Sequence, residues 1–237
     1  MHRFLLLLVL AIAGCEVYTP PLPGAGTTSH KTQTQGQTGG GASAAFASVA
    51  RAVEPVAERE CRRRASGLNC DFLIRIDPNP KAPANAYQSV TRSGRPVITF
   101  TRAMLADLSN QDELAFVMSH EAAHHIRGHL ARQEQNAISG AIIFAGLATV
   151  AGASASDIAE AQDFGALLGS RSYSKDFELE ADQLGTIITH QAGFRPSVGV
   201  RFFSRLPDPG DKFLGTHPAN HDRVQVVQQT IRQYNLN

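Results

Sequence analysis

The sequence has almost no excess of charge: 22 Lys and Arg residues balance 21 Asp and Glu residues, which gives a formal net charge of +1 over 237 residues. A nucleic-acid-binding protein usually carries a basic excess concentrated on one face, so nucleic acid is not an expected partner. No internal repeat is visible either. The remaining composition, 43% hydrophobic and 18% charged, is that of a globular protein with one sizeable core.

Cysteine is also scarce, and the first of the three ends an export-type segment. The stretch MHRFLLLLVLAIAGC has a basic start, an apolar run too short to span a membrane, and small residues before Cys15. We therefore expect residues 1–14 to be a signal peptide. The end of this run, IAGC, resembles a bacterial lipobox, which implies lipidation of Cys15 and attachment to a membrane through acyl chains. Glu16 in the next position implies, by the sorting rule of Gram-negative bacteria, the outer membrane of the cell envelope. The alternative is a simple secreted protein.

The other two cysteines, Cys61 and Cys70, are predicted to pair with each other. If Cys15 carries lipid, they are the only two left in an oxidising compartment. Neither has a spacing typical of a metal ligand. The short loop that such a disulfide closes would stabilise the fold by about 2–3 kcal/mol in the chain-entropy estimate.

Residues 15–45 are expected to form a lipidated, flexible tether, because Gly, Thr, Gln and Pro dominate and aliphatic residues are almost absent. The folded domain is then expected over residues 46–237, mainly helical with a small antiparallel sheet. The predicted strands are DFLIRID, NAYQSVTR and RPVITFT, the last two joined as a hairpin through Ser93 and Gly94. The uncharged stretch 135–156 would nearly suit a membrane span, but its many Ala, Gly and Ser residues favour a tightly packed helix or hairpin.

A helix with a metal-binding pattern is predicted to start at Asn110, since Glu113 three residues later completes a capping-box-like pattern. It contains the motif HEAAH. At about 100° per residue, His120 and His124 lie about 40° apart, one turn from each other. Their imidazole nitrogens can reach one metal ion at about 2.0–2.1 Å, while the adjacent Glu121 can reach a water beside that metal.

A second helical stretch, ELEAD, offers carboxylates for the same site. Glu178 and Asp182 are four residues apart and share a helix face. A catalytic zinc needs three protein ligands, and two His with one Glu is an established set. Asp182 could then accept a hydrogen bond from the far nitrogen of a ligand His. The alternative is a solvated acidic face. The angular arithmetic directs His125 and His129 away from the metal, as packing residues or as partners of the ligands.

The motifs ELAFVMSHEAAHHIRGHLAR, SKDFELEADQLG and THPANHDR resemble, in this order, those of the gluzincin metallopeptidase family of HtpX and BepA, related to the CAAX prenyl endopeptidases. The resemblance covers roughly residues 80 to 232 and is nearest to single-domain periplasmic lipoproteins. It implies a zincin-like metallopeptidase domain of α+β, mainly α class, with the sheet beside the HExxH helix. One zinc ion is implied on His120, His124 and Glu178, with Glu121 as the catalytic glutamate.

The same resemblance assigns roles to the last motif. His217 is implied at the active-site rim, where it would hydrogen-bond the reacting carbonyl group or occupy the open metal position as a gate. Arg223 is implied as a buttress of the ligand carboxylates. From the residues alone, His217 and its neighbours would be surface residues at the start of a final helix.

The expected function is that of a membrane-anchored zinc metalloendopeptidase that hydrolyses unfolded or misassembled envelope proteins. Its expected partners are these substrates, the membrane that holds the lipid anchor, and envelope assembly factors. An edge strand from the hairpin at 85–100 would bind an extended substrate as an added strand. Two alternatives stay open: a chaperone or assembly factor for outer-membrane proteins with a latent or gated zinc site, and a zinc hydrolase that does not cleave peptides.

Overall fold

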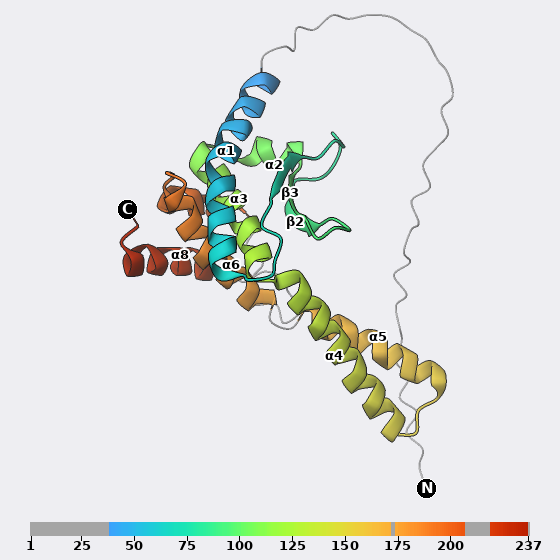
Figure 1. Cartoon of the computed structure of the whole chain (residues 1–237). Helices are drawn as coiled ribbons and strands as arrows, with labels where there is room; N and C mark the ends of the chain where they lie inside the picture. The colour runs from blue at the N-terminus through green and yellow to red at the C-terminus, as the bar shows by residue number, and fades with distance from the viewer. Residues whose placement is uncertain (1–37, 172–173, 207–218, 237) are drawn as a thin grey trace, which may run out of the picture. The chain divides into compact units, whose positions relative to one another are not determined.

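The structure, a computed structural model, describes residues 38–171, 174–206 and 219–236 (Figure 1). The helices are α1 (Thr38–Arg64), α2 (Arg102–Asp107), α3 (Gln111–Ile126), α4 (His129–Val150), α5 (Ala155–Arg171), α6 (Ser174–Gln191), α7 (Pro196–Gly199) and α8 (Asn220–Tyr234), with a 3-10 helix, η1, at Val200–Arg205. The strands are β1 (Leu73–Ile76), β2 (Ala86–Val90) and β3 (Pro96–Phe100). This part of the chain is mainly helical with one small sheet, which confirms the predicted fold class.

The predicted signal peptide and Cys15 lie outside the described residues. Helix α1 already begins at Thr38, within the stretch expected to be a flexible tether up to residue 45.

The sheet has the strand order β1-β3-β2. Strands β2 and β3 form the predicted antiparallel hairpin, with Ala86 opposite Phe100 and Val90 opposite Pro96. Strand β1 is parallel to β3, so the sheet is mixed, and the prediction of a purely antiparallel sheet is wrong for this strand. The loop at 77–85 reverses the chain after β1, and the hairpin turn reverses it again after β2, so β3 runs in the same direction as β1. Strand β1 pairs with the side of β3 that β2 leaves free.

Helix α3 lies at the centre of the helices and packs mainly against α6 and α1. Every residue from Glu113 to Ala123 is buried. Its start is the predicted one: the side chain of Asn110 accepts a hydrogen bond from the Glu113 N–H at 3.0 Å, and the Glu113 carboxylate accepts one from the Ser109 N–H at 2.8 Å. Because α1 and α6 both pack against α3, the side chains of α3 are held in fixed positions.

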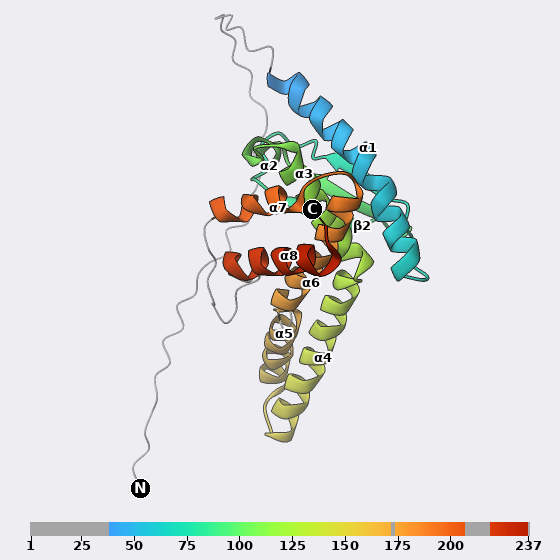
Figure 2. The ribbon, with the colours of Figure 1, turned by 90° about the vertical axis from the view of Figure 1, so that its left-hand side faces the viewer.

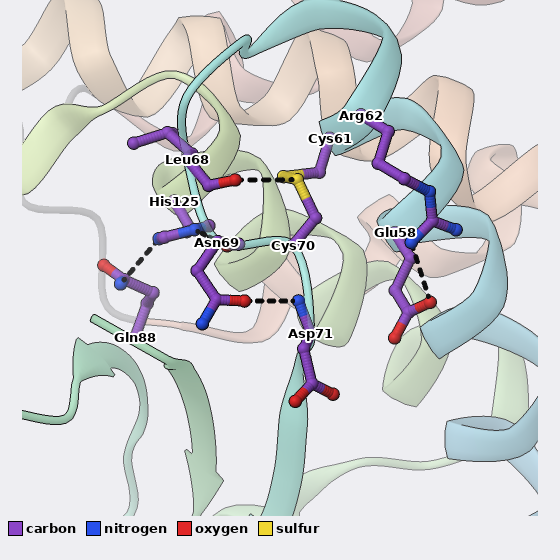
Figure 3. The surroundings of a disulfide bond; sticks show 9 residues. All are labelled: Glu58, Cys61, Arg62, Leu68, Asn69, Cys70, Asp71, Gln88 and His125. Carbon is purple, nitrogen blue, oxygen red and sulfur yellow. Dashed lines mark hydrogen bonds and ion pairs between the residues drawn. A yellow bond between two sulfur atoms is a disulfide. The ribbon is translucent and has the colours of Figure 1, made fainter. Parts of the chain in front are cut away.

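Cys61 and Cys70 form the predicted disulfide, which ties the end of α1 to the segment that enters β1 (Figure 3). The residue before Cys70, Asn69, turns its backbone carbonyl toward α3. That carbonyl accepts a hydrogen bond of 2.8 Å from Nε2 of His125. The disulfide loop therefore contacts the helix that carries the HExxH motif.

Helices α4 and α5 run side by side as a hairpin, in agreement with the prediction of tight packing (Figures 1 and 2). They approach so closely because glycines meet at the contact. A Cβ placed on Gly140 would lie 2.0 Å from the carbonyl oxygen of Gly165, and one placed on Gly169 would lie 2.0 Å from that of Asn136. The small residues therefore occupy the interface between the two helices.

The large apolar side chains of α4 remain exposed as a result. Ile142, Leu147 and Val150 are 67%, 63% and 89% exposed. Ile138 and Ile143 of the same helix are also exposed, and we call these five residues the α4 apolar face. No helix in the described part of the chain is long and apolar enough to cross a membrane.

Candidate metal centre and active site

Three side chains from two helices converge on one point. The Nε2 atoms of His120 and His124, on α3, are 3.0 Å apart, and each lies 3.4 Å from a different carboxylate oxygen of Glu178, on α6. A tetrahedral metal ion with bonds of about 2.0–2.1 Å separates its ligand atoms by about 3.3–3.4 Å. The spacing of the three donors therefore fits a zinc-sized ion, and two His with one Glu is a donor set that zinc uses in catalytic sites.

The close approach of α6 to α3 depends on small residues. Ala181 is fully buried, and a Cβ placed on Gly185 would lie 3.1 Å from the Cα of His120. Glu178, Ala181 and Gly185 lie on one face of α6, since they are spaced by three and four residues. The sequence ELEADQLG therefore supplies both the carboxylate and the small residues that let it reach the histidines.

Asp182 and Arg223 lie behind His120. Nδ1 of His120 is 2.9 Å from Oδ1 of Asp182, which is fully buried. Arg223, on α8, donates two hydrogen bonds of 2.7 Å to the same carboxylate, and its Nη2 lies 3.5 Å from Glu178. The guanidinium also stacks 3.6 Å above the ring of Phe203. Both side chains therefore lie directly beside the candidate ligand His120 and contact it or its carboxylate partner.

Burial and the carboxylates of Asp182 and Glu178 have opposite effects on the pKa of His120. Burial lowers its pKa, but the hydrogen bonds with Asp182 and Glu178 outweigh this effect and raise the pKa of His120 to about 9 in the metal-free protein. The two carboxylates therefore favour a positive charge at this position, which a bound metal ion would supply in place of the proton.

His125 points away from the metal ligands, as the angular arithmetic predicts. It contacts Asn69 through the hydrogen bond described above, and its ring meets that of Phe72 edge-on at 5.4 Å. His129 lies where one of its two predicted roles, that of a partner of a ligand, would place it, because its Nδ1 lies 2.8 Å from Nδ1 of the candidate ligand His124. The arithmetic assumed one continuous helix. The structure instead ends α3 at Ile126 and starts α4 at His129.

Glu121 lies in the wall of a cleft of about 460 Å³ that also contains the three candidate ligands. Burial raises the pKa of its carboxyl group. Residues of the hairpin edge line the same cleft, from Ala84 to Gln88. Apolar side chains line much of the rest: Met104, Val117, Leu130, Phe177, Phe202, Phe203 and Leu206. The cleft thus combines a polar centre with apolar walls.

His217 lies outside the described residues, so its predicted place at the rim stays a prediction. The neighbouring His221 is exposed and pairs with Asp222 at 2.8 Å. Sequence reasoning missed the cleft wall formed by Phe202 and Phe203. It also missed the pairing of Glu180 with Arg132 at 2.8 and 3.2 Å. No pattern in the sequence joins these residues, since they come from different elements.

A helix that carries HExxH, with a third ligand contributed by a later helix, is the arrangement of the gluzincin class of metallopeptidases. The sequence profile of peptidase family M48 matches residues 43–231, and the chain belongs to this family. The resemblance to HtpX and BepA is thereby confirmed. M48 peptidases are metal-dependent, and the three converging side chains form a possible metal site of this kind.

The chain is similar to several named proteases. The chain is 33% identical over 141 residues to the putative beta-barrel assembly-enhancing protease of Vibrio cholerae, covering 53% of this chain and 28% of that protein. It is 27% identical over 172 residues to the mitochondrial metalloendopeptidase OMA1 of Saccharomyces cerevisiae, covering 68% of this chain and 48% of the relative. The beta-barrel assembly-enhancing protease of Escherichia coli K12 is 33% identical over 137 residues, covering 52% and 28%. The chain thus matches less than half the length of each of these relatives.

Proposed function

We propose that this protein is a zinc metalloendopeptidase that hydrolyses peptide bonds in unfolded or misassembled proteins of the bacterial cell envelope. The observation that carries the proposal is the convergence of His120, His124 and Glu178 at metal-ligand spacing, with Glu121 beside them in the same cleft. Membership of family M48 supports peptidase chemistry at such a site.

His120, His124 and Glu178 would hold the ion. A zinc ion bound there supplies a Lewis acid that polarises a carbonyl group and makes water acidic enough to be deprotonated near neutral pH. Glu121 acts as the general base: its carboxylate accepts a proton from the attacking water and then passes it to the leaving amide nitrogen. Asp182 and Arg223 hold His120 in the orientation that its role requires.

Strand β2 supports an extended peptide as the substrate. It is an edge strand of the sheet, and residues next to and within it line the cleft. A peptide that pairs with such an edge is held mainly through its backbone, so the mode is tolerant of sequence. The apolar walls of the cleft add affinity for side chains that a folded protein would bury. Both features favour unfolded chains over native ones.

The proposed cellular place is the periplasmic face of the outer membrane, with a lipid on Cys15. The α4 apolar face supports a position at a lipid surface, since five large apolar side chains stand exposed on one helix. Two of the relatives are named for beta-barrel assembly, which supports a role in quality control of envelope proteins.

The test is cleavage of a denatured, fluorescently labelled protein by the zinc-loaded chain beside its Glu121→Gln variant. We expect the variant to bind one zinc ion and to cleave at least about 10²-fold more slowly, because it lacks the base. His124→Ala is the matched control and should lose both zinc and cleavage.

Each other result has a distinct meaning. Near-normal cleavage by zinc-loaded Glu121→Gln would contradict the mechanism. No cleavage of any protein by the zinc-loaded parent would instead favour the assembly factor with a latent or gated site. Hydrolysis of small amides alone, with denatured protein left intact, would favour a zinc hydrolase that is not a peptidase.

A further inference from the structure

A third histidine stands behind the candidate metal ligands. Nδ1 of His129 lies 2.8 Å from Nδ1 of His124, and Nε2 of His129 lies 3.3 Å from Oε2 of Glu180. Glu180 in turn accepts two hydrogen bonds from the guanidinium of Arg132, at 2.8 and 3.2 Å. His129 is 4% exposed, so this chain of contacts begins in the interior and ends at the surface.

The fold places His129 there through a break between two helices. Helix α3 ends at Ile126, and Gly128 has a φ of 66°, a left-handed conformation that glycine adopts without strain. The turn brings the first residue of α4, His129, back toward His124. Its ring stacks on Phe177 with 4.6 Å between the centroids and 6° between the planes. Because Phe177 precedes Glu178, this stack connects the histidine to the helix that carries the third ligand.

The proton positions follow from the metal geometry. His124 turns its Nε2 toward His120 and Glu178, so Nε2 is the atom that would bind the metal. A neutral imidazole carries one N–H, which leaves the hydrogen of His124 on Nδ1. That N–H must donate to Nδ1 of His129. The hydrogen of His129 is then on Nε2, where it donates to the carboxylate of Glu180.

The two ligand histidines are therefore held in the same way through different residues. Nδ1 of His120 contacts the carboxylate of Asp182 directly, at 2.9 Å, and Arg223 binds that carboxylate. Nδ1 of His124 reaches a carboxylate through one additional imidazole, and Arg132 binds that carboxylate. Partners of this kind fix the tautomer and the ring orientation of a metal-ligating histidine.

We propose that His129 is a positioning residue of the metal centre, which together with Glu180 holds His124 with its proton on Nδ1 and its Nε2 facing the metal. This inference rests on the proposed zinc site. It assigns to His129 no contact with substrate and no step in the reaction.

The test measures zinc affinity in the full chain, by competition with a chromophoric chelator, for the wild type and two variants. His129→Leu keeps a side chain of similar bulk but removes the acceptor for His124. We expect its zinc affinity to fall about 10–100-fold, the usual cost of losing such a partner. His129→Asn places an amide oxygen near the former Nδ1 position, so it should recover most of that loss. The visible spectrum of the cobalt-substituted protein should change in the leucine variant and return toward the wild-type spectrum in the asparagine variant.

His125→Leu is the matched control, because it also replaces a buried histidine of this region but one that contacts Asn69 instead of a ligand. It should leave zinc affinity unchanged in the folded protein. A loss of zinc affinity in His125→Leu as large as in His129→Leu, or an unrescued loss in His129→Asn, would assign His129 to packing alone and overturn the inference.

Glu180→Ala provides a second measurement, at a residue that is only partly buried. It should lower zinc affinity by a smaller factor than His129→Leu. If His129→Leu does not fold, unchanged zinc affinity in Glu180→Ala overturns the inference by itself. If the wild type binds no zinc, the proposed function fails together with the inference. If the wild type binds zinc and these variants bind it equally well, only the inference fails.

Discussion

Arg223 and Asp182 form a two-point ion pair in the interior, with Nε to Oδ2 and Nη2 to Oδ1 both at 2.7 Å. The pair joins α8 to α6 directly behind the candidate metal ligand His120. Both charges are buried, since the two side chains are 7% and 0% exposed. Each ion is therefore compensated only by the other and by the neighbouring polar groups of the site.

Removal of one partner should be costly for this reason. Arg223→Met leaves the Asp182 carboxylate buried with His120 as its remaining donor, and we expect the free energy of unfolding to fall by about 3–5 kcal/mol. Urea denaturation of the metal-free protein measures the change. Arg62→Met is the matched control, because Arg62 and Glu58 form an exposed pair at 3.3 Å whose loss should cost about 0–1 kcal/mol. Equal costs for the two substitutions would contradict the interpretation.

A second buried carboxylate predicts how stability depends on pH. Glu113 is 1% exposed and binds Arg205 through two contacts of 2.6 Å. Burial alone would raise the pKa of Glu113, but the hydrogen bonds from Arg205 and from the Ser109 N–H outweigh it and hold the pKa below its ordinary value of 4.5. Since the folded-state pKa is the lower one, Glu113 stabilises the fold above the unfolded-state pKa, and this contribution is lost as pH falls through the folded-state pKa.

The variant Glu113→Gln should reveal this contribution. We expect it to be about 1–3 kcal/mol less stable than the wild type at pH 7, because the Arg205 charge loses its partner. The difference should shrink as the pH is lowered below about 4.5, since the wild-type carboxylate is then progressively protonated. Urea unfolding at pH 7 and at several acidic pH values measures the stability difference and its decrease with pH. A difference that stays constant across this range would show that Glu113 does not titrate with folding.

The parts of the fold that were predictable are those set by short-range patterns. The Asn110 cap, the β2–β3 hairpin and the spacing of His120 and His124 each depend on residues within a few positions of one another. The disulfide followed from a count, because the expected lipid on Cys15 left Cys61 and Cys70 as the pair, and these two cysteines are joined in the structure. Local geometry of this kind is encoded in the sequence itself.

The features that sequence reasoning missed depend on where chain segments meet. The sequence left open whether His129 packs in the core or supports a ligand, and its contact with His124 depends on the break at Gly128. A glycine at that position could have suggested the break, but it could not show what the turned chain would reach. The parallel pairing of β1 likewise depends on a choice of neighbour, since β1 lies beside β3 and not beside β2.

The α4 apolar face gives a prediction about membranes that is separate from the catalytic site. Ile142→Glu together with Leu147→Glu places two charges among the exposed apolar side chains, at positions 67% and 63% exposed. We expect the fraction of protein that co-sediments with liposomes to fall, because charged side chains do not enter the lipid interface. Zinc affinity and thermal stability should stay as in the wild type. Since a lipid on Cys15 would mask the effect, the comparison uses unlipidated protein, and unchanged co-sedimentation would contradict a lipid contact of this face.

The close contact between α4 and α5 can be tested at two glycines of α4. A Cβ on Gly140 would lie 2.0 Å from the Gly165 carbonyl oxygen, so Gly140→Ala must push α4 and α5 apart, at a cost of about 1–3 kcal/mol for overpacking. Gly146 is the matched control. Nothing lies within 4 Å of a Cβ there, and Gly146→Ala should stabilise α4 by up to about 1 kcal/mol through helix propensity.

Amide hydrogen exchange over residues 135–168 distinguishes the two substitutions. Exchange should become faster in Gly140→Ala and slower in Gly146→Ala, because local opening of the hairpin is what the measurement reports. Zinc affinity should stay unchanged in both variants, since His129 and Arg132 lie in the first turn of α4 and neither Gly140 nor Gly146 does. If both variants slowed exchange equally, the two helices would not be in the close contact that the glycines allow, and the exposure of the large α4 side chains would need another cause.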